Sequence, residues 1–439
     1  MFSDIPIKYF NGTHRAVDPV TTLKNHESMV KIAGITRITD ITDLDRLGIP
    51  VYSVIRPTAE YGGISVYSGK GITKDQAKAS GIMEGYERYA AEFQTKDEFR
   101  VKKFEFNKDF NDFNDFNGEE NGINGINGIN GINGINRINE TNMANMVNIN
   151  DLILPKSFVF EKKKLNNIEW IKSMDIVSNE EIFVPANAVF HPYTNKNATS
   201  LFKSNTNGLA SGNFLEEAVL HGIFEVVERD AWSLFEITKF NKKQIDVDSI
   251  DNTLILDVLD KFKSNDINIK IMDLTADVKI PTIAVSSDDT KLKDPALLTL
   301  GVGTHLNPEI AILRALTEVA QSRATQIHGT REDTVRANFM RKAGYERMKR
   351  INKDYFDDEK EKINFSKIKD KSSKSLKTDI EIACKEITKC NFDKILFTDL
   401  TRHEIGVNVV RVIIPKMELY SLDNERMGQR SLEFSKKSN

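Results

Sequence analysis

The sequence predicts an α/β fold assembled from a repeated unit, in which a short strand, a glycine-rich loop and a long helix follow one another. Three blocks of the chain have this order. The first has a strand at 64–67 before Gly69 and Gly71, the second runs through 207–213, and the third has a strand at 296–300 before Gly301 and Gly303. This arrangement is typical of anion sites, because a helix N-terminus presents free N–H groups. None of the blocks matches the P-loop pattern.

The helices of the first two blocks carry nearly the same motif. Ala77-x-x-Ser80-Gly81-Ile82-x-Glu84-x-x-Glu87-Arg88 recurs as Ala218-x-x-His221-Gly222-Ile223-x-Glu225-x-x-Glu228-Arg229. In the third block the motif weakens to Ala311-x-x-Arg314-Ala315-Leu316-x-Glu318-x-x-Gln321. We expect that helix to begin at Asn307 as N-cap, with Pro308 at the first helical position and Glu309 near the positive helix end.

Glutamates three residues apart lie on one face of a helix, so each copy directs acidic or amide groups to one place. Apolar residues cover well over half the circumference of the second helix, at 214–236, which predicts that it is largely enclosed. Because uncompensated burial costs several kcal/mol per carboxylate, a bound cation is the simplest explanation. The alternative is a set of solvated faces, or of Glu–Arg pairs between helices.

Oxygen ligands alone select hard cations, Mg²⁺ or Ca²⁺. Carboxylates beside glycine loops and arginines favour Mg²⁺ that bridges nucleotide phosphates. Gly81 and Gly222 stand one turn before the glutamates. Because glycine has a poor helix propensity, we expect a ligand or a second helix to approach closely at these positions. The sequence assigns no nucleophile or general base, so the catalytic residues stay unknown, and His221, His305 and His328 are interpreted as structural.

The composition is that of a globular protein in the cytoplasm. The chain has 439 residues, of which 40% are hydrophobic and 28% charged. The net charge of −3 gives no drive towards nucleic acid or an anionic membrane, and we expect neither partner. No apolar run reaches the roughly 18 residues of a membrane span, and we expect no signal peptide. Cys384 and Cys390 alone make neither a disulfide framework nor zinc-ligand spacing.

Residues 107–150 differ from the rest of the chain. Repeated Asn-Gly-Ile triplets run from Asn121 to Asn136, and glycine and asparagine disfavour the interiors of helices and strands. We interpret 107–150 as a disordered or loosely looped insertion, with a β-solenoid patch as the alternative.

Further strands are expected at 269–273, 282–286 and 407–415, the last of them stopped by Pro415. The strongly charged residues 341–380 are interpreted as exposed helix and linker.

Together these motifs resemble the YcaO family. Residues 73–88 resemble its first ATP-binding motif, the spacing Asn213-x-x-x-Glu217-x7-Glu225-x-x-Glu228-Arg229 resembles its second, and Arg314 to Arg323 resemble its third. Gly12-Thr13-His14-Arg15 with Thr22, followed by Gly34-Ile35-Thr36-Arg37, resembles its opening. The resemblance implies a catalytic domain over 10–415, with the insertion 107–150 inside it and a C-terminal tail at 416–439.

The resemblance also implies an ATP site without a P-loop. The implied Mg²⁺ ligands are Glu84, Glu87, Glu217, Glu225, Glu228 and Glu318. The implied nucleotide contacts are Arg15, Thr22, Ser80, Asn213, Arg229, Gln321 and Arg323. Family members phosphorylate a backbone amide oxygen of a peptide, after which a nucleophile attacks the carbon and phosphate leaves. A side-chain nucleophile gives an azoline, whereas sulfide gives a thioamide.

Within the family, azoline-forming members commonly end in a Pro-rich tail, and residues 431–439 are not of that kind. The Ile/Asn/Lys-rich, stand-alone chain resembles methanogen members that thioamidate a glycine in the α subunit of methyl-coenzyme M reductase. The resemblance thus implies that protein as substrate, a TfuA-like partner, a sulfide source and a homodimer. Two alternatives stay open. One is an azoline-forming enzyme of a peptide natural product, and the other is an ATP-binding accessory protein for ribosomal-protein methylthiolation.

Overall fold

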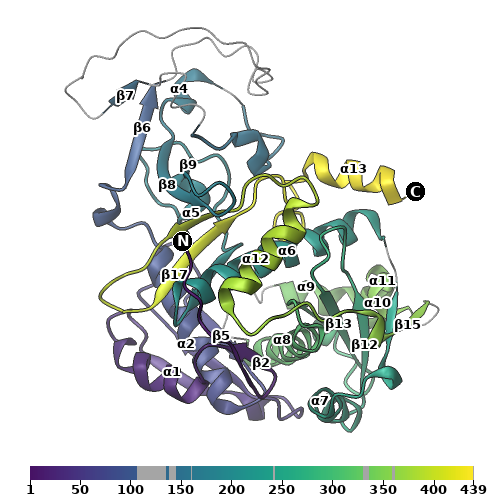
Figure 1. Cartoon of the computed structure of the whole chain (residues 1–439). Coiled ribbons are helices and arrows are strands. Elements are labelled where there is room, and N and C mark those ends of the chain that lie inside the picture. The colour runs from purple at the N-terminus through teal and green to yellow at the C-terminus, as the bar shows by residue number, and fades with distance from the viewer. Residues whose placement is uncertain are drawn as a thin grey trace.

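The computed structural model of the chain describes residues 1–105, 135–137, 145–159, 161–240, 243–329, 336–357 and 361–438 (Figure 1). Within these ranges helices and several separate sheets alternate, which confirms the mixed α/β class. Most strand pairs are antiparallel, and the exceptions among the described strands are β11 with β15 and β6 with β7. Each of the three motif helices follows directly on a strand of its own sheet.

The first unit is a three-stranded antiparallel sheet in the order β3 (Arg37–Asp40), β4 (Val51–Ile55) and β5 (Val66–Lys70). Helix α2 (Lys74–Ala91) follows β5 and packs on it. A capping box starts the helix, because the Thr73 hydroxyl accepts from the backbone of Gln76 and the Gln76 side chain accepts in return from Thr73.

The second unit belongs to a seven-stranded sheet. Its strands follow the order β10 (Leu209–Gly212), β17 (Asn408–Ile413), β16 (Leu396–Asp399), β8 (Glu169–Asp175), β6 (Val101–Glu105) and β7 (Ile135–Arg137), with β9 (Glu181–Pro185) beside β8. Helix α6 (Leu215–Thr238) follows β10 and packs on β10 and β17. The predicted strand at 407–415 is therefore confirmed as β17.

The third unit is a five-stranded sheet in the order β14 (Thr299–Thr304), β13 (Thr282–Asp289), β12 (Ile267–Asp273), β11 (Gln244–Asp246) and β15 (Lys362–Asn364). Helix α8 (Pro308–His328) follows β14 and packs on β13 and β14. The predicted cap is confirmed, since the Asn307 side chain accepts from the backbone of Glu309 and Ile310. The predicted strands at 269–273 and 282–286 are β12 and β13.

Smaller elements complete the described part of the chain. The hairpin of β1 (Lys8–Phe10) and β2 (Thr13–Arg15) precedes α1 (Pro19–His26). The remaining helices are α4 (Lys162–Leu165), α5 (Ala186–Val189), α7 (Thr253–Lys263), α9 (Arg336–Ala343), α10 (Tyr345–Ile351), α11 (Lys353–Phe356), α12 (Leu376–Thr388) and α13 (Gln429–Ser438). No helix in the described ranges is long and apolar enough to cross a membrane.

The three units contact one another in a cycle. Helix α2 contacts β10 of the second unit, α6 contacts β14 of the third unit, and α8 contacts β5 of the first unit. Each motif helix therefore bridges from its own strand to the motif strand of the next unit. This arrangement brings helices that are far apart in the sequence around one centre.

The glycines that precede the helices correct the sequence interpretation. Gly69 lies within β5, and Gly301 and Gly303 lie within β14, so these glycines are strand residues and do not form phosphate-binding loops. A Cβ on Gly69 would collide with the carbonyl of Ala77 in α2, and a Cβ on Gly301 would collide with the carbonyl of Ala315 in α8. Their function is to let a helix backbone lie directly on a strand backbone.

Gly81 and Gly222 are the helix residues that permit this close approach. A Cβ on Gly81 would stand 3.2 Å from the nitrogen of Gly69, and a Cβ on Gly222 would stand 3.0 Å from the carbonyl oxygen of Gly208 and 2.5 Å from Val412 Cγ2. Close approach was predicted at both helix glycines, but the partner is a strand and not a ligand or a second helix.

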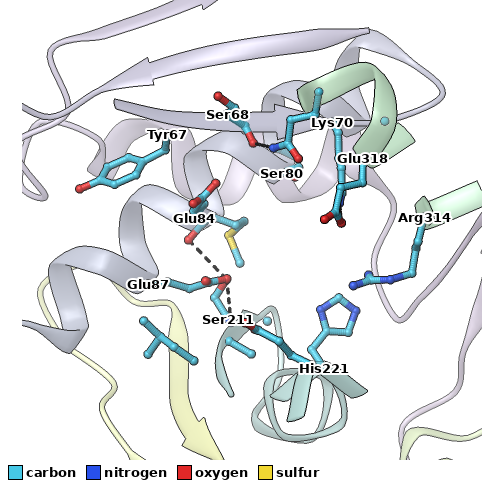
Figure 2. Close-up of a pocket in the computed structure, with 18 of the residues that line it drawn as sticks. Tyr67, Ser68, Lys70, Ser80, Glu84, Glu87, Ser211, His221, Arg314 and Glu318 are labelled. Carbon is cyan, nitrogen blue, oxygen red and sulfur yellow. Dashed lines mark hydrogen bonds and ion pairs between the residues drawn. The ribbon is translucent and has the colours of Figure 1, made fainter. Parts of the chain in front are cut away.

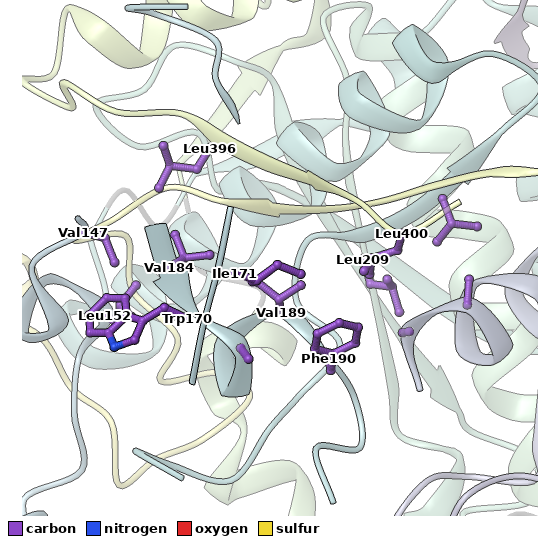
Figure 3. Close-up of a cluster of buried hydrophobic side chains, with 14 of the residues drawn as sticks. Val147, Leu152, Trp170, Ile171, Val184, Val189, Phe190, Leu209, Leu396 and Leu400 are labelled. Atoms are coloured by element: carbon purple, nitrogen blue, oxygen red, sulfur yellow. The ribbon is translucent and has the colours of Figure 1, made fainter. Parts of the chain in front are cut away.

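The core beneath the seven-stranded sheet is apolar and tightly closed (Figure 3). Trp170 and Ile171 of β8 belong to one buried cluster with Val184 of β9, Phe190 after α5 and Leu396 of β16, and each of these side chains is at most 2% exposed. Burying a side chain of this size stabilises the fold by about 1.5–3 kcal/mol. This core fixes the position of β10 and β17, on which α6 lies.

Two parts of the chain differ from the sequence interpretation. Most of the predicted insertion lies outside the described residues, but 135–137 form β7 beside β6, and Met146, Val147 and Ile149 are buried in the core. Residues 146–149 of the predicted insertion are therefore part of the packed core. Within 341–380 helices are present as predicted, yet Tyr355 and Phe356 are buried.

The C-terminal residues 416–438 pack on the fold. Glu418 is fully buried and accepts hydrogen bonds from the backbone of Gly428 (2.9 Å) and Ser431 (2.8 Å). Arg430 of α13 forms an ion pair with Asp230 of α6 at 2.8 Å. These contacts tie α13 to α6.

Candidate active site

A cavity of about 590 Å³ lies where the three motif helices meet. Ser80, Glu84 and Glu87 of α2 line it, as do Glu217, His221, Glu225, Glu228 and Arg229 of α6 and Arg314, Glu318 and Gln321 of α8. Figure 2 shows Glu84 and Glu87 on one side and Arg314 and Glu318 on the other. The helical spacing therefore does what the sequence predicted, and it brings all three copies of the motif to one place.

Three of the acidic side chains are paired with basic ones. Glu318 lies 2.5 Å from Lys70, Glu217 lies 2.8 Å from Arg15, and Glu84 lies 3.1 Å from Arg88. Among the described residues no group of three or more His, Cys, Asp or Glu side chains is arranged to hold a metal ion. The carboxylates thus share a cavity without converging on one point. None of these three pairs joins two helices, because Lys70 and Arg15 lie in strands and Glu84 and Arg88 lie in the same helix.

Glu87 and Glu228 are the carboxylates that burial affects most clearly. Glu87 accepts from the Ser211 hydroxyl at 2.8 Å, and burial, opposed by the charge of Arg88, raises its pKa to about 7. Glu228 is 4% exposed, and its Oε2 atom has no hydrogen-bond partner in the described part of the chain. Burial and the nearby charge of Glu318 raise the pKa of Glu228 to about 7. For both carboxylates, a bound cation would offset the free-energy cost of holding a buried negative charge.

Five arginines line the cavity with these acids, namely Arg15, Arg56, Arg88, Arg229 and Arg314. Arg88 Nη1, Arg229 Nε and Arg314 Nε are buried and have no hydrogen-bond partner within the described ranges. The guanidinium of Arg229 also lies over the Trp232 ring, 5.2 Å from its centre, which orients it. Unpaired guanidinium donors suit phosphate oxygens, which they bind in a planar fork.

The polar end of the cavity is built by α1 and the start of α6. The Asn213 side-chain nitrogen donates to the Thr22 hydroxyl at 3.1 Å, while Asn213 Oδ1 is buried with no partner among the residues described. Thr22 itself is held by α1, whose N-cap is Asp18. At the far side Gln321 donates to the backbone carbonyl of Ser68. Thr22, Asn213 and Gln321 all line the cavity. Their contact with a nucleotide stays a prediction.

Arg323 does not reach the cavity, which corrects its place among the predicted nucleotide contacts. It is fully buried, with Nε 2.8 Å from Asp45 and Nη2 3.0 Å from Asp289. At about 100° per residue, Arg323 lies roughly 160° from Gln321 around the axis of α8, close to the opposite face. Helical geometry therefore separates it from the motif residues that precede it.

Sequence reasoning missed several residues of the cavity, among them Lys70, Arg88, His191, Ser211 and His221. His221 stands where Ser80 and Arg314 stand in the other copies of the motif, so the repeat itself could have identified it. Its Nδ1 lies 3.3 Å from Arg15, and burial with the charges of Arg15 and Arg314 holds the pKa of the imidazole well below its usual value. His221 is therefore a neutral group of the site and not only a structural residue.

The donor set fits a metal-bound nucleotide. Unpaired oxygens of Glu228 and Asn213 offer hard ligands, and unpaired nitrogens of Arg88, Arg229 and Arg314 offer phosphate donors. The volume lies in the range of small-molecule sites.

A family model described as a YcaO cyclodehydratase that binds ATP and Mg²⁺ matches residues 68–418. The chain belongs to the YcaO family. Over 417 residues it is 47% identical to an uncharacterized protein of Methanothermobacter thermautotrophicus, covering 95% of this chain and 98% of the relative. It is 29% identical over 327 residues to an uncharacterized protein in the tfuA 3′ region of Rhizobium leguminosarum bv. trifolii, covering 73% of this chain and 69% of that protein.

Solved structures share the fold. The YcaO protein of Methanopyrus kandleri bound with AMPPCP and Mg²⁺ superposes with a TM-score of 0.72 at 25% identity, with 98% of each chain covered. A heterocyclase in complex with substrate and cofactor superposes with a TM-score of 0.74 at 22% identity, over 95% of this chain and 54% of the other. This YcaO chain is thus an ATP-dependent enzyme of its family, whose ligands are ATP and Mg²⁺.

Proposed function

We propose that this YcaO chain activates a peptide backbone amide with ATP and converts it into a thioamide. The observation that carries the proposal is the cavity itself, where carboxylates from three helices face arginines and unpaired polar atoms remain. The family description and the Methanopyrus kandleri structure with AMPPCP and Mg²⁺ support an ATP site at this place.

We assign roles to the residues by their chemistry. Glu84, Glu87, Glu217, Glu225, Glu228 and Glu318 would hold Mg²⁺. Arg15, Thr22, Ser80, Asn213, Arg229 and Gln321 would contact the nucleotide. Bound Mg²⁺ neutralises the charge of the phosphates and so permits an amide oxygen to approach the terminal phosphorus.

The reaction balances with sulfide as the second substrate. The amide oxygen forms a bond to the terminal phosphorus of ATP, and the bond between that phosphorus and the bridging oxygen breaks to release ADP. Hydrosulfide then adds to the amide carbon, and the carbon–oxygen bond breaks as phosphate leaves. One amide, ATP and hydrosulfide thus give one thioamide, ADP and phosphate. In these steps the arginines of the cavity stabilise the negative charge on the transferred phosphoryl group.

The proposed substrate is a glycine of the α subunit of methyl-coenzyme M reductase, with a TfuA-like protein as partner. The methanogen relative that matches nearly the whole chain supports the substrate. The relative in the tfuA 3′ region supports the partner. A homodimer and a cytoplasmic location remain predictions from the sequence.

The test is a reconstitution with purified chain, TfuA-like protein, ATP, Mg²⁺, sulfide and a glycine-containing reductase peptide. Mass spectrometry should show the exchange of one oxygen for sulfur, located at the glycine by fragmentation. Omission of ATP or of sulfide should abolish the exchange. An unchanged peptide with all components present, while ATP binding is intact, would refute thioamidation.

A second function, azoline formation, is favoured by the family description as a cyclodehydratase. In that reaction a cysteine, serine or threonine side chain of the peptide replaces sulfide as the nucleophile. The same mass measurement separates the two, because azoline formation removes water and needs no sulfide. Peptides with and without such a side chain should be compared in parallel.

A further inference from the structure

Lys70 places an ammonium group inside the cavity. It is the last residue of β5, and its Nζ lies 2.5 Å from Oε2 of Glu318 on α8. Both side chains are 20% exposed, and Figure 2 shows them beside each other at the cavity wall. Among the described residues that line the cavity, Lys70 is the only lysine.

The ammonium faces two carboxylates from separate helices. Glu318 of α8 and Glu228 of α6 are close enough for the charge of Glu318 to act on Glu228, and the charge of Lys70 acts on both. The charges of Arg229 and Arg314 also act on both carboxylates. Each of these arginines belongs to a motif helix, and its charge is spread over a rigid, planar guanidinium group. Lys70 alone combines a compact charge with a long flexible stem.

The pair of Lys70 and Glu318 is not needed to hold α8 against β5. Gln321 donates to the backbone carbonyl of Ser68, and the hydroxyls of Ser68 and Thr325 lie 3.2 Å apart. These contacts join the same helix and strand within two turns of Glu318. A partly exposed ion pair adds roughly 0–1 kcal/mol to stability. Stability alone therefore does not explain why a lysine stands at position 70.

We propose that Lys70 is a tethered counter-ion that occupies the cation position beside Glu318 and Glu228 in the ligand-free enzyme and yields it to Mg²⁺ when the nucleotide enters. The inference rests on the proposed ATP site and deepens it. An ammonium at this position competes with a bare cation, because both need the same carboxylate oxygens. When nucleotide arrives with the metal, the displaced ammonium turns to the phosphate oxygens. Metal and nucleotide binding are thereby coupled.

The test measures metal binding without nucleotide and without turnover. Mn²⁺, detected by electron paramagnetic resonance, is titrated into the ligand-free chain and into Lys70→Met. The variant is expected to bind bare Mn²⁺ about tenfold more tightly and to bind Mg²⁺–AMPPCP about tenfold more weakly, by calorimetry. Lys70→Arg, which keeps the charge, should restore both values towards those of the unaltered chain.

Two matched variants isolate the pairing. Lys74→Met removes a positive charge four residues away, where Lys74 is 64% exposed and paired with Asp40, and it should change neither affinity. In a Glu318→Gln background, Lys70→Met should no longer tighten Mn²⁺ binding, since the shared carboxylate is gone.

The outcomes separate this inference from the proposed function. If Lys70→Met binds bare Mn²⁺ no more tightly than the unaltered chain, the counter-ion role is refuted even though the ATP site stands. If the unaltered chain binds neither Mn²⁺ nor Mg²⁺–AMPPCP, the ATP site and this inference fall together.

Discussion

Gly69 of β5 and Gly81 of α2 lie backbone against backbone, so that a Cβ on Gly81 would stand 3.2 Å from the Gly69 nitrogen and 3.3 Å from its Cα. In the second unit a Cβ on Gly222 of α6 would stand 3.0 Å from the carbonyl oxygen of Gly208, the residue before β10. Contact of this kind sets the distance between each motif helix and its strand, and hence the distance across the cavity.

Substitution of Gly69 by alanine is expected to destabilise the fold strongly. The added Cβ would collide with the Ala77 carbonyl and with Gly81, and backbone cannot rotate aside as a side chain can. We expect a loss of about 3 kcal/mol or more in the free energy of unfolding, the upper end of overpacking effects. Urea unfolding checks it. The control is Gly48→Asn, because Gly48 has φ of 60°, which asparagine tolerates, and open space around it. Equal stability of the two variants would contradict the close contact.

Glu228→Gln should separate stability from ligand binding. Glu228 has a folded-state pKa of about 7, above its unfolded value, so its ionisation costs stability as pH rises through that range. At pH 8 the ligand-free variant should therefore melt at a higher temperature than the unaltered chain. It should also bind Mg²⁺–AMPPCP at least about tenfold more weakly, a loss of about 1.4 kcal/mol.

The control for this variant is Glu216→Gln on the same helix. Glu216 is buried but accepts from the Ser3 backbone at 2.7 Å and does not line the cavity. Calorimetry should find its affinity for Mg²⁺–AMPPCP unchanged. A similar loss in both variants would show that the effect is structural.

Arg323→Ala should destabilise the fold, although Arg323 itself does not line the cavity. Removal of the guanidinium leaves Asp45 and Asp289 buried without that partner, which costs about 3–5 kcal/mol. Arg341→Ala breaks the exposed pair with Asp294 and should cost less than about 1 kcal/mol. Thermal unfolding in the absence of ligand measures both. A small effect of Arg323→Ala would refute the buried network.

The imidazole of His191 should make stability fall in acid. Burial, with the charges of Arg411 and Arg88, lowers its pKa to about 3, below the unfolded value of about 6.5. Between these values the unfolded chain binds a proton that the folded chain does not, so stability is lost as pH falls below about 6.5, by up to about 1.4 kcal/mol per pH unit.

His191→Asn keeps a group able to bond Ser204 but does not titrate. Unfolding free energies of both proteins from pH 7 to pH 5 should diverge, with the unaltered chain losing more. Parallel curves would mean that His191 takes up its proton normally in the folded state.

The sequence predicted the parts of the site that depend on local geometry. The positions of Glu84, Glu87 and Glu318 follow from helical spacing, and the Asn307 cap follows from side-chain chemistry next to a proline. The same spacing, applied one step further, would have excluded Arg323. His221 could have been found from its place in the repeat.

Other features depend on contacts that no single segment contains. Gly69 and Gly301 resemble loop residues in composition, and only the helix that lies on them explains why they stand in strands. Lys70 was not predicted as a site residue because the predicted strand ended at residue 67, whereas β5 extends to residue 70. Strand ends are set by pairing partners, in this case Val51 of β4, and pairing across the chain is not visible in local pattern.

The cyclic contact of the three units has a kinetic consequence. The groups that meet in the cavity are far apart along the chain, since Lys70 and Glu318 are separated by 248 in residue number and Arg15 and Glu217 by 202. Contacts of such long range form late, because a large loop must close before they contribute. A refolding chain should therefore recover its helical circular dichroism before it recovers affinity for nucleotide. The binding of a fluorescent ATP analogue during refolding would measure when the three units come into contact.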